Sequence, residues 1–271
     1  MLVCLLSAAA LGQRVGIIIP SNNTDAEKYL DVLSAKFEGR AAVLDRSLVQ
    51  SAFISQNIEN AFNLSTSDAK RLASAIGCDY LLIIRAETLR RASFSRDDYF
   101  EGFAALYLVS GRTGRLVKWQ LKSFEENSQA KADASLLNST RSTADELIAA
   151  MHNASESDRN ELSRPSMEEV PDTDSPAAKN LRPPVPYKRI KPEYTRSASL
   201  YNVRAVVELE ADIAATGEVT RTEVVRWAGF GLDESVQNIV RTMNWRPAMR
   251  DGKPLPMRIL LRYNFLKVEK E

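Results

Sequence analysis

Residues 257–265 read Met-Arg-Ile-Leu-Leu-Arg-Tyr-Asn-Phe and carry the clearest pattern in the chain. Large apolar and aromatic residues stand at every second position: Met257, Ile259, Leu261, Tyr263 and Phe265. Because successive side chains of a strand point to opposite faces, this alternation predicts a β-strand with one buried and one exposed face. The positions between them are expected to form the exposed side: Arg258, Leu260, Arg262 and Asn264.

The sequence before this strand supplies partners for it. Residues 204–212 alternate in the same way, and a turn at Ala215-Thr-Gly217 leads to a second strand at residues 219–227. A helix is predicted from Asp233, and a short one at about residues 194–201. Together these elements predict an α+β domain over residues 183–271, in which two helices close a three-stranded antiparallel sheet.

Several residues around these elements suit structural roles. Trp245 and Phe265 are large enough to anchor a thin core, and Pro247 prevents the preceding helix from continuing. Gly217 and Asp251-Gly252 suit tight turns. We assign none of them a chemical role.

Taken in order, these features resemble the C-terminal domain of TonB-family energy transducers. The matching elements are Pro192, Val206 to Asp212, Gly217, Val224-Val225, Leu232-Asp233, Trp245-Arg-Pro247-Ala248, Asp251-Gly252 and Tyr263-Asn-Phe265. The resemblance covers about residues 183–268. Their order and spacing together, rather than any single element, carry it.

The resemblance implies a mode of action. Domains of this family bind a short extended segment of an outer-membrane receptor at a sheet edge, where main-chain hydrogen bonds provide the affinity. Residues 257–265 are the matching edge, so the expected partner-binding residues are Arg258, Leu260, Arg262 and Asn264. The alternative is that the two arginines only protect an exposed edge from aggregation.

The chain also departs from the family. Energy transducers normally have an N-terminal membrane helix and a long Pro/Lys-rich span, whereas this chain has a folded domain before the C-terminal one. Tyr194-Thr195 stands where the family often has Tyr-Pro. We therefore expect a periplasmic, TonB-like partner-binding protein linked to outer-membrane receptor transport. The alternative is a structural cell-envelope or peptidoglycan-associated factor without energy transduction, and homodimerisation stays open.

Residues 1–13 have the character of a signal peptide. An apolar run is followed by small residues, which predicts cleavage between about Ala10 and Gln13 and a periplasmic location. No Lys or Arg precedes the run, and a start further upstream would instead give an inner-membrane anchor. No stretch reaches the ~20 apolar residues that a membrane helix requires.

Residues 14–152 predict an α/β domain. Its expected elements are a buried strand at Arg14–Pro20, helices opening at Thr24 and Ser65, a strand at Asp79–Ala86, a hairpin at Glu101–Phe124 and a helix at about Gln129–Met151. The order faintly resembles the periplasmic domains of curli-secretion proteins and the amino-terminal domain of TolB. No residue roles are carried over from that resemblance.

Residues 153–182 differ from both flanking parts. They are rich in Ser, Asn, Asp, Glu and Pro and have few large apolar residues, so we expect a flexible acidic linker. The stretch that follows is basic, with Arg182, Lys188, Arg189, Lys191, Arg196 and Arg204. Either the linker and the domain edge attract each other weakly, or the basic residues form a binding face.

Composition excludes several classes of function. Lys and Arg number 36 against 35 Asp and Glu, so the chain has no overall field to attract nucleic acid. A single histidine, His152, excludes a multi-histidine metal site or a His-based triad. Cys78 is expected to be a small buried side chain. We therefore expect no enzyme, no cofactor and no metal; a glycan or phosphate site remains as an alternative at Arg85, Arg90, Arg91 and Arg96.

Overall fold

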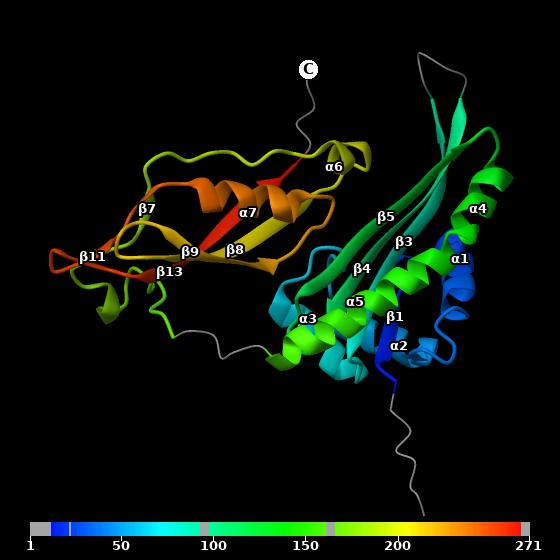
Figure 1. The fold of residues 1–271 in the computed structure, drawn as a ribbon, viewed down its shortest axis with the longest axis horizontal. Coiled ribbons are helices and arrows are strands. Elements are labelled where there is room, and N and C mark those ends of the chain that lie inside the picture. The colour runs from blue at the N-terminus through cyan, green and yellow to red at the C-terminus, as the bar shows by residue number, and fades with distance from the viewer. Residues whose placement is uncertain (1–11, 22, 93–97, 161–165, 267–271) are drawn as a thin grey trace, which may run out of the picture. The chain divides into compact units, whose positions relative to one another are not determined.

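The computed structural model describes residues 12–266 except 22, 93–97 and 161–165 (Figure 1). The chain divides into two compact units. The first comprises residues 1–61 and 68–160, and the second comprises residues 62–67 and 161–271.

The first unit is built on one mixed sheet with the strand order β2-β1-β3-β4-β5. Its strands are β1 (Arg14–Ile18), β2 (Ala42–Val43), β3 (Tyr80–Arg91), β4 (Tyr99–Ser110) and β5 (Leu116–Glu126). Strand β1 runs parallel to β2 and β3, while β3, β4 and β5 are successively antiparallel. The α/β character expected for this part of the chain is confirmed.

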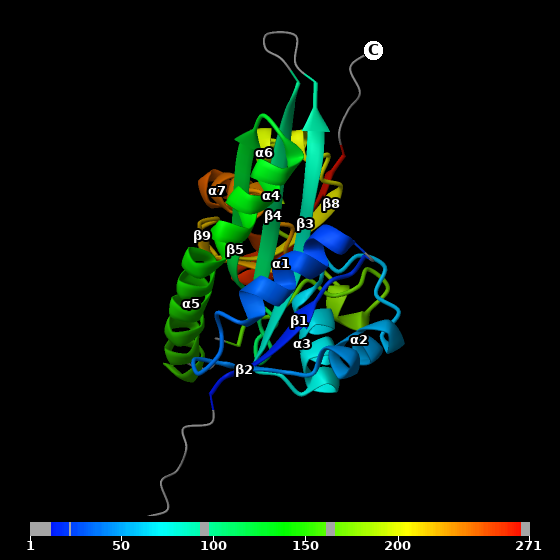
Figure 2. The same cartoon turned by 90° about the vertical axis from the view of Figure 1, so that its right-hand side faces the viewer.

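Three helices cover one face of this sheet: α1 (Thr24–Ser34), α4 (Gln129–Asn138) and α5 (Thr140–Asn160) (Figure 2). The apolar core between them and the sheet includes Tyr29 and Leu147, which are fully buried. The remaining helices are α2 (Arg46–Ser55), which contacts β1, and α3 (Thr66–Ile76). The sequence analysis did not predict α2.

Two local details differ from the expectations. The cap of α1 is Asn23 rather than Thr24, since the Asn23 side chain accepts a hydrogen bond from the amide of Asp25 at 2.8 Å. The long helix predicted at about 129–151 is interrupted at Ser139. There the Ser139 and Thr140 hydroxyls donate to the carbonyls of Leu136 and Leu137, a local bonding pattern that competes with helix continuation.

The described residues of 153–182, where the sequence predicts a flexible acidic linker, include regular secondary structure. Helix α5 continues to Asn160, because a helix already anchored by Leu147 and Met151 extends at little cost through polar residues. Further on lie a 3₁₀ turn, η1 (Pro176–Ala178), and the short strand β6 (Leu181–Arg182). Composition alone could not show that part of this stretch would pair its backbone with the second unit.

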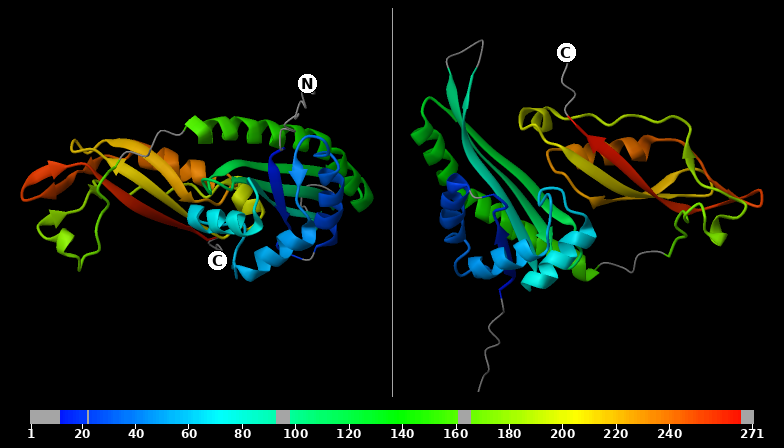
Figure 3. Two further views of the ribbon diagram at one scale, coloured as in Figure 1. Left: turned by 90° about the horizontal axis from the view of Figure 1, so that it is seen from below. Right: turned by 180° about the vertical axis from the view of Figure 1, so that it is seen from behind.

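The second unit contains a three-stranded antiparallel sheet with the order β13-β8-β9. These strands are β8 (Ala205–Ile213), β9 (Val219–Arg226) and β13 (Met257–Phe265), and the helices are α6 (Arg196–Leu200) and α7 (Leu232–Thr242). Helix α7, drawn in orange in Figure 3, lies across one face of the sheet. Its buried Val236 and Val240 share the core with Leu209 of β8. The predicted α+β arrangement is confirmed.

Short strands extend this unit at one end. They are β7 (Val185–Pro186), β10 (Trp245–Arg246), β11 (Ala248–Arg250) and β12 (Lys253–Leu255). Strand β7 pairs with β10, and β11 lies between β12 and β6. The proline-rich entry is therefore fixed to the segment that contains Trp245, whose side chain is only 3% exposed.

Candidate functional site

Strand β13 lies at an edge of its sheet. It pairs with β8 along its whole length, from Met257 opposite Ile213 to Phe265 opposite Ala205. The backbone N–H and C=O of Arg258 point away from β8, because they bond to Glu168 and Val170 at 2.8 and 3.1 Å. Backbone direction alternates along a strand, so the N–H and C=O of Leu260, Arg262 and Asn264 also face the outer edge. Over the described residues, no strand covers that edge beyond Arg258.

Three of the four predicted site residues are exposed along this edge. Leu260 is 60% exposed, the Arg262 side chain is 62% exposed, and Asn264 is exposed as well. Arg258 differs from the expectation, since only 5% of its surface is accessible. Alternation correctly predicted which face the four side chains share, but it carries no information about which part of that face is covered.

The buried Arg258 has a specific partner. Its guanidinium donates two hydrogen bonds to the Asp212 carboxylate, from Nε at 2.6 Å and from the terminal nitrogen at 2.9 Å. The hydrogen bonds to Asp212 raise the pKa of Arg258 above its ordinary value. A bidentate pair of this kind is rigid and self-satisfied, so Arg258 contributes its backbone, rather than its charge, to the edge.

Arg262 is also paired, although it is exposed. Its Nε lies 3.2 Å from Glu208, and the same carboxylate accepts from Arg226 of β9 at 3.0 Å. Register explains the arrangement, because Glu208 of the central strand stands opposite Arg262 on one side and Arg226 on the other. Glu208 therefore offsets the charge of only one of these two arginines, and Arg262 is held in an ion pair rather than presented as a free cation.

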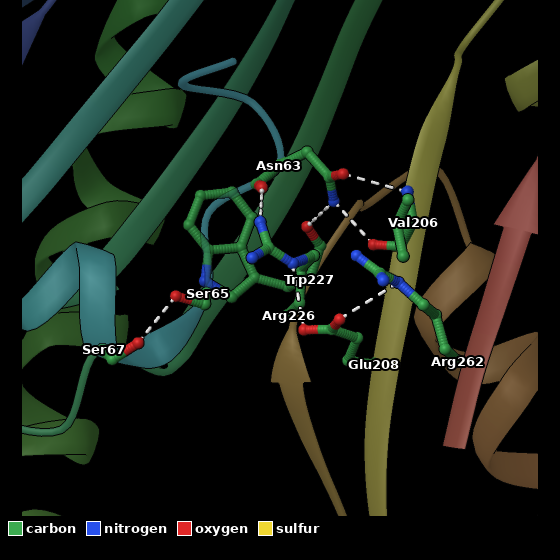
Figure 4. A network of polar contacts seen from close by, with 8 residues as sticks. All are labelled: Asn63, Ser65, Ser67, Val206, Glu208, Arg226, Trp227 and Arg262. Carbon is green, nitrogen blue, oxygen red and sulfur yellow. Dashed lines mark hydrogen bonds and ion pairs between the residues drawn. The ribbon is translucent and has the colours of Figure 1, made fainter. Parts of the chain in front are cut away.

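Residues 62–67, which belong to this unit, lie at the other edge of the sheet, where β9 ends (Figure 4). The Asn63 side chain donates to the carbonyls of Val206 and Trp227 at 2.8 and 2.7 Å, and it accepts from the Val206 amide at 2.9 Å. The Trp227 amide bonds to the Leu64 carbonyl at 3.3 Å. Nothing in the local sequence pattern indicated this role for Asn63, which lies 143 residues from Val206.

Asp233 is a strongly perturbed carboxyl group among the described residues of this unit. It accepts hydrogen bonds from the amides of Ala228 and Gly229, each at 2.8 Å, at the start of α7. Burial raises the pKa of Asp233 to about 7, and the two backbone hydrogen bonds oppose the rise. Because its oxygens accept from the backbone of Ala228 and Gly229, the group fixes the loop before α7.

Other residues considered from the sequence lie in ordinary surroundings. Arg85, Arg90 and Arg91 pair with Glu87, Asp98 and Glu101, while Arg96 lies outside the described residues. Burial raises the pKa of the Cys78 thiol to about 11, and His152 is exposed. Within the described residues, no cluster of His, Cys, Asp and Glu has the make-up of a metal site. None of the described helices is both long and apolar enough to cross a membrane.

Comparisons with solved structures give partial likenesses. Lipoprotein GNA1162 from Neisseria meningitidis matches at 20% identity and a TM-score of 0.34, covering 51% of this chain and 98% of that one. The TonB C-terminal domain of Pseudomonas aeruginosa matches at 18% identity and a TM-score of 0.29, covering 40% and 99%. The C-terminal domain of LpoB from Salmonella enterica matches at 12% identity and a TM-score of 0.29, covering 44% and 86%. These scores are too low to carry an argument. Among curated proteins, no sequence relative is found.

A family model gives the firmer assignment. The model described as the Gram-negative bacterial TonB protein C-terminal matches residues 190–266. This range holds α6, α7 and all three strands of the β13-β8-β9 sheet, including the whole β13 edge. Residues 190–266 are therefore a C-terminal domain of the TonB family.

Proposed function

We propose that this chain is a periplasmic partner-binding protein that takes up an extended segment of another envelope protein as a new strand along β13. The observation that carries the proposal is the outer edge from Leu260 to Asn264, whose backbone groups face away from β8. An added strand would satisfy these groups, and its affinity would come mainly from main-chain hydrogen bonds. Such a role requires recognition and no catalytic group.

The match of residues 190–266 to the Gram-negative bacterial TonB protein C-terminal supports a partner in the cell envelope. We assign the partner to the class of outer-membrane receptors, which would present a short extended segment to the periplasm. Coupling to a proton-driven motor is a separate question, and the β13 edge does not require it.

The test uses two substitutions at one position. Leu260→Pro removes an outward-facing N–H without disturbing the bonds to β8, because prolines are tolerated on edge strands at such positions. Leu260→Ala shortens the side chain and keeps the N–H. We expect Leu260→Pro to weaken binding about 10-fold, which corresponds to losing about one or two net hydrogen bonds, and Leu260→Ala to change it less than about 3-fold.

The ligands are labelled synthetic peptides that copy the periplasmic amino-terminal segments of outer-membrane receptors from the same genome, and fluorescence anisotropy measures their binding. Peptides that bind the wild type and both variants equally would show that β13 is not the binding edge. Absence of binding to all three chains would remove receptor segments as the partner class.

A second candidate, a peptidoglycan-associated factor, is favoured by one specific observation. Lys188, Arg189 and Lys191 are exposed in the entry segment, where they present positive charge to solvent. Reversing all three to Glu would abolish retention on isolated peptidoglycan if this surface binds the anionic cell wall. Retention that is unchanged, or absent from the wild type, would eliminate this candidate.

A further inference from the structure

The β13 edge already holds a short segment of its own chain. We name residues Glu168–Val170 the strap. Glu169 forms a parallel bridge with Arg258, in which the Arg258 amide donates to the Glu168 carbonyl at 2.8 Å and the Val170 amide donates to the Arg258 carbonyl at 3.1 Å. This is the bonding pattern of an added β-strand, limited to one residue of the edge.

A side-chain contact fixes the strap in register. The guanidinium of Arg250, on β11, donates two hydrogen bonds to the Glu168 carboxylate, and one of these measures 3.0 Å. The same guanidinium reaches the carbonyl of Ala177 at 3.3 Å, so it also holds the turn that follows the strap. Further along the chain, Leu181 of β6 pairs with Arg250 of β11, so the segment after the strap is also attached to β11.

The strap is held more weakly than the paired strands of the sheet. Its Arg250–Glu168 pair is about a third exposed on each side, at 33% and 40%, where water and salt screen the attraction. Val170 keeps 38% of its surface exposed, so the strap gains little from apolar burial. A segment with few main-chain bonds and little buried apolar area can open locally while the rest of the sheet stays folded.

We propose that the strap is a built-in competitor for the β13 edge, which a partner strand must displace to pair with Arg258. The inference rests on the proposed function of the same edge. Residues 260–264 are open, whereas the position of Arg258 is taken. Strand β13 has nine residues and includes Arg258, so a partner that pairs over its full length would overlap the strap. The strap thus selects for partners that bind well enough to release it.

Amide exchange in the full-length chain tests whether the strap docks as described. Arg250→Glu and Glu168→Arg each place like charges together and should release the strap, while the double reversal restores the attraction. We expect the Arg258 amide to exchange at least about 10-fold faster in each single variant and to regain protection in the double variant. The Ile259 amide, which faces β8, is the internal control and should stay protected throughout.

Val170→Pro provides an independent release, because it removes the N–H that bonds to Arg258 without changing charge. If the charge variants also lose protection at Ile259, this substitution decides the question. Protection of the Arg258 amide that survives Val170→Pro would overturn the inference.

Competition is measured with a labelled peptide of the strap sequence, Ser166 to Asp172 (Ser-Met-Glu-Glu-Val-Pro-Asp), added in trans. We expect it to bind the Val170→Pro chain about 10-fold or more tightly than the wild type, as follows when only about a tenth of the wild-type edge is free. Binding that is equal in both chains, or absent from both, would overturn the inference. If this peptide behaves as expected while receptor peptides bind no variant, the strap stands and the proposed partner class fails.

Discussion

Asn63 shows how one side chain can terminate a sheet. Beyond Arg226, strand β9 no longer runs alongside β8, and the amide and carbonyl of Val206 would be left without partners. The Asn63 carboxamide supplies both a donor and an acceptor to Val206 and a further donor to Trp227. A side chain with both functions is required at this position, which is why an amide fits and a carboxylate does not.

We predict that Asn63→Ala lowers the free energy of unfolding of the second unit by about 2 to 4 kcal/mol, because buried backbone groups lose their partners. Asn63→Asp is nearly isosteric, yet it should cost at least as much, since the oxygen that replaces Nδ2 would face the carbonyls of Val206 and Trp227. Urea titration followed by tryptophan fluorescence provides the measurement. A mild effect of Asn63→Asp relative to Asn63→Ala would contradict the assigned hydrogen bonds.

Asp233 makes stability depend on pH. Burial raises its pKa from the ordinary value of 3.8 to about 7 in the folded state, so between these values the folded state binds more protons than the unfolded state. The stabilising contribution is therefore complete below about pH 4 and is lost as the pH rises through 7. We predict that this group lowers the unfolding free energy by about 2 kcal/mol between pH 5 and pH 7.

Asp233→Asn isolates the contribution of this carboxyl group to the pH dependence of stability, because the amide does not titrate. Urea titrations of both chains at pH 5 and pH 7 should show a smaller pH dependence for the variant, by the amount given above. Parallel pH profiles would mean that Asp233 is ionised in the folded state at both pH values.

At the scale of elements, the two turns of the second unit place different demands on glycine. Gly217 and Gly252 both have positive φ, at 88° and 79°. A Cβ at Gly217 would overlap the backbone carbonyl of Trp245, whereas a Cβ at Gly252 would meet nothing within 4 Å. The first turn needs glycine for space and conformation, and the second needs it for conformation alone.

We predict that Gly252→Ala costs about 1 kcal/mol, the usual penalty for a left-handed conformation. Gly217→Ala should cost about 3 kcal/mol or more, because the β8–β9 turn must also move away from Trp245. Thermal unfolding of the two variants compares them directly. If the two variants lost the same stability, the backbone carbonyl of Trp245 would not restrict the side chain at position 217, contrary to the structure.

At the scale of the whole molecule, the proposed function requires the chain to reach the periplasm. We predict that fractionation of cells expressing the native locus finds it in the periplasmic fraction, with an amino terminus near Gln13 on sequencing. An inner-membrane product with a longer amino terminus would instead restore motor-coupled energy transduction as the leading function. A cytoplasmic product would contradict the proposal.

The sequence by itself determined the elements whose patterns are local. The alternation of residues 257–265 predicted β13 with the bounds that the structure has, and the hairpin predicted at Glu101–Phe124 is formed by β4 and β5. The order of motifs around Trp245 also indicated the TonB family, which the family model confirms for residues 190–266. The strand and the hairpin depend on neighbours within a few residues, so periodicity and turn chemistry suffice to find them.

Only the tertiary structure decided how the edges of the second sheet are used. It buried Arg258 against Asp212, brought Asn63 to Val206 and laid the strap on β13. Pairing at a sheet edge is made largely by backbone N–H and C=O groups, which nearly every residue carries alike. No pattern of side chains therefore predicts edge pairing. It becomes visible only in the tertiary structure, where distant segments of the chain lie side by side.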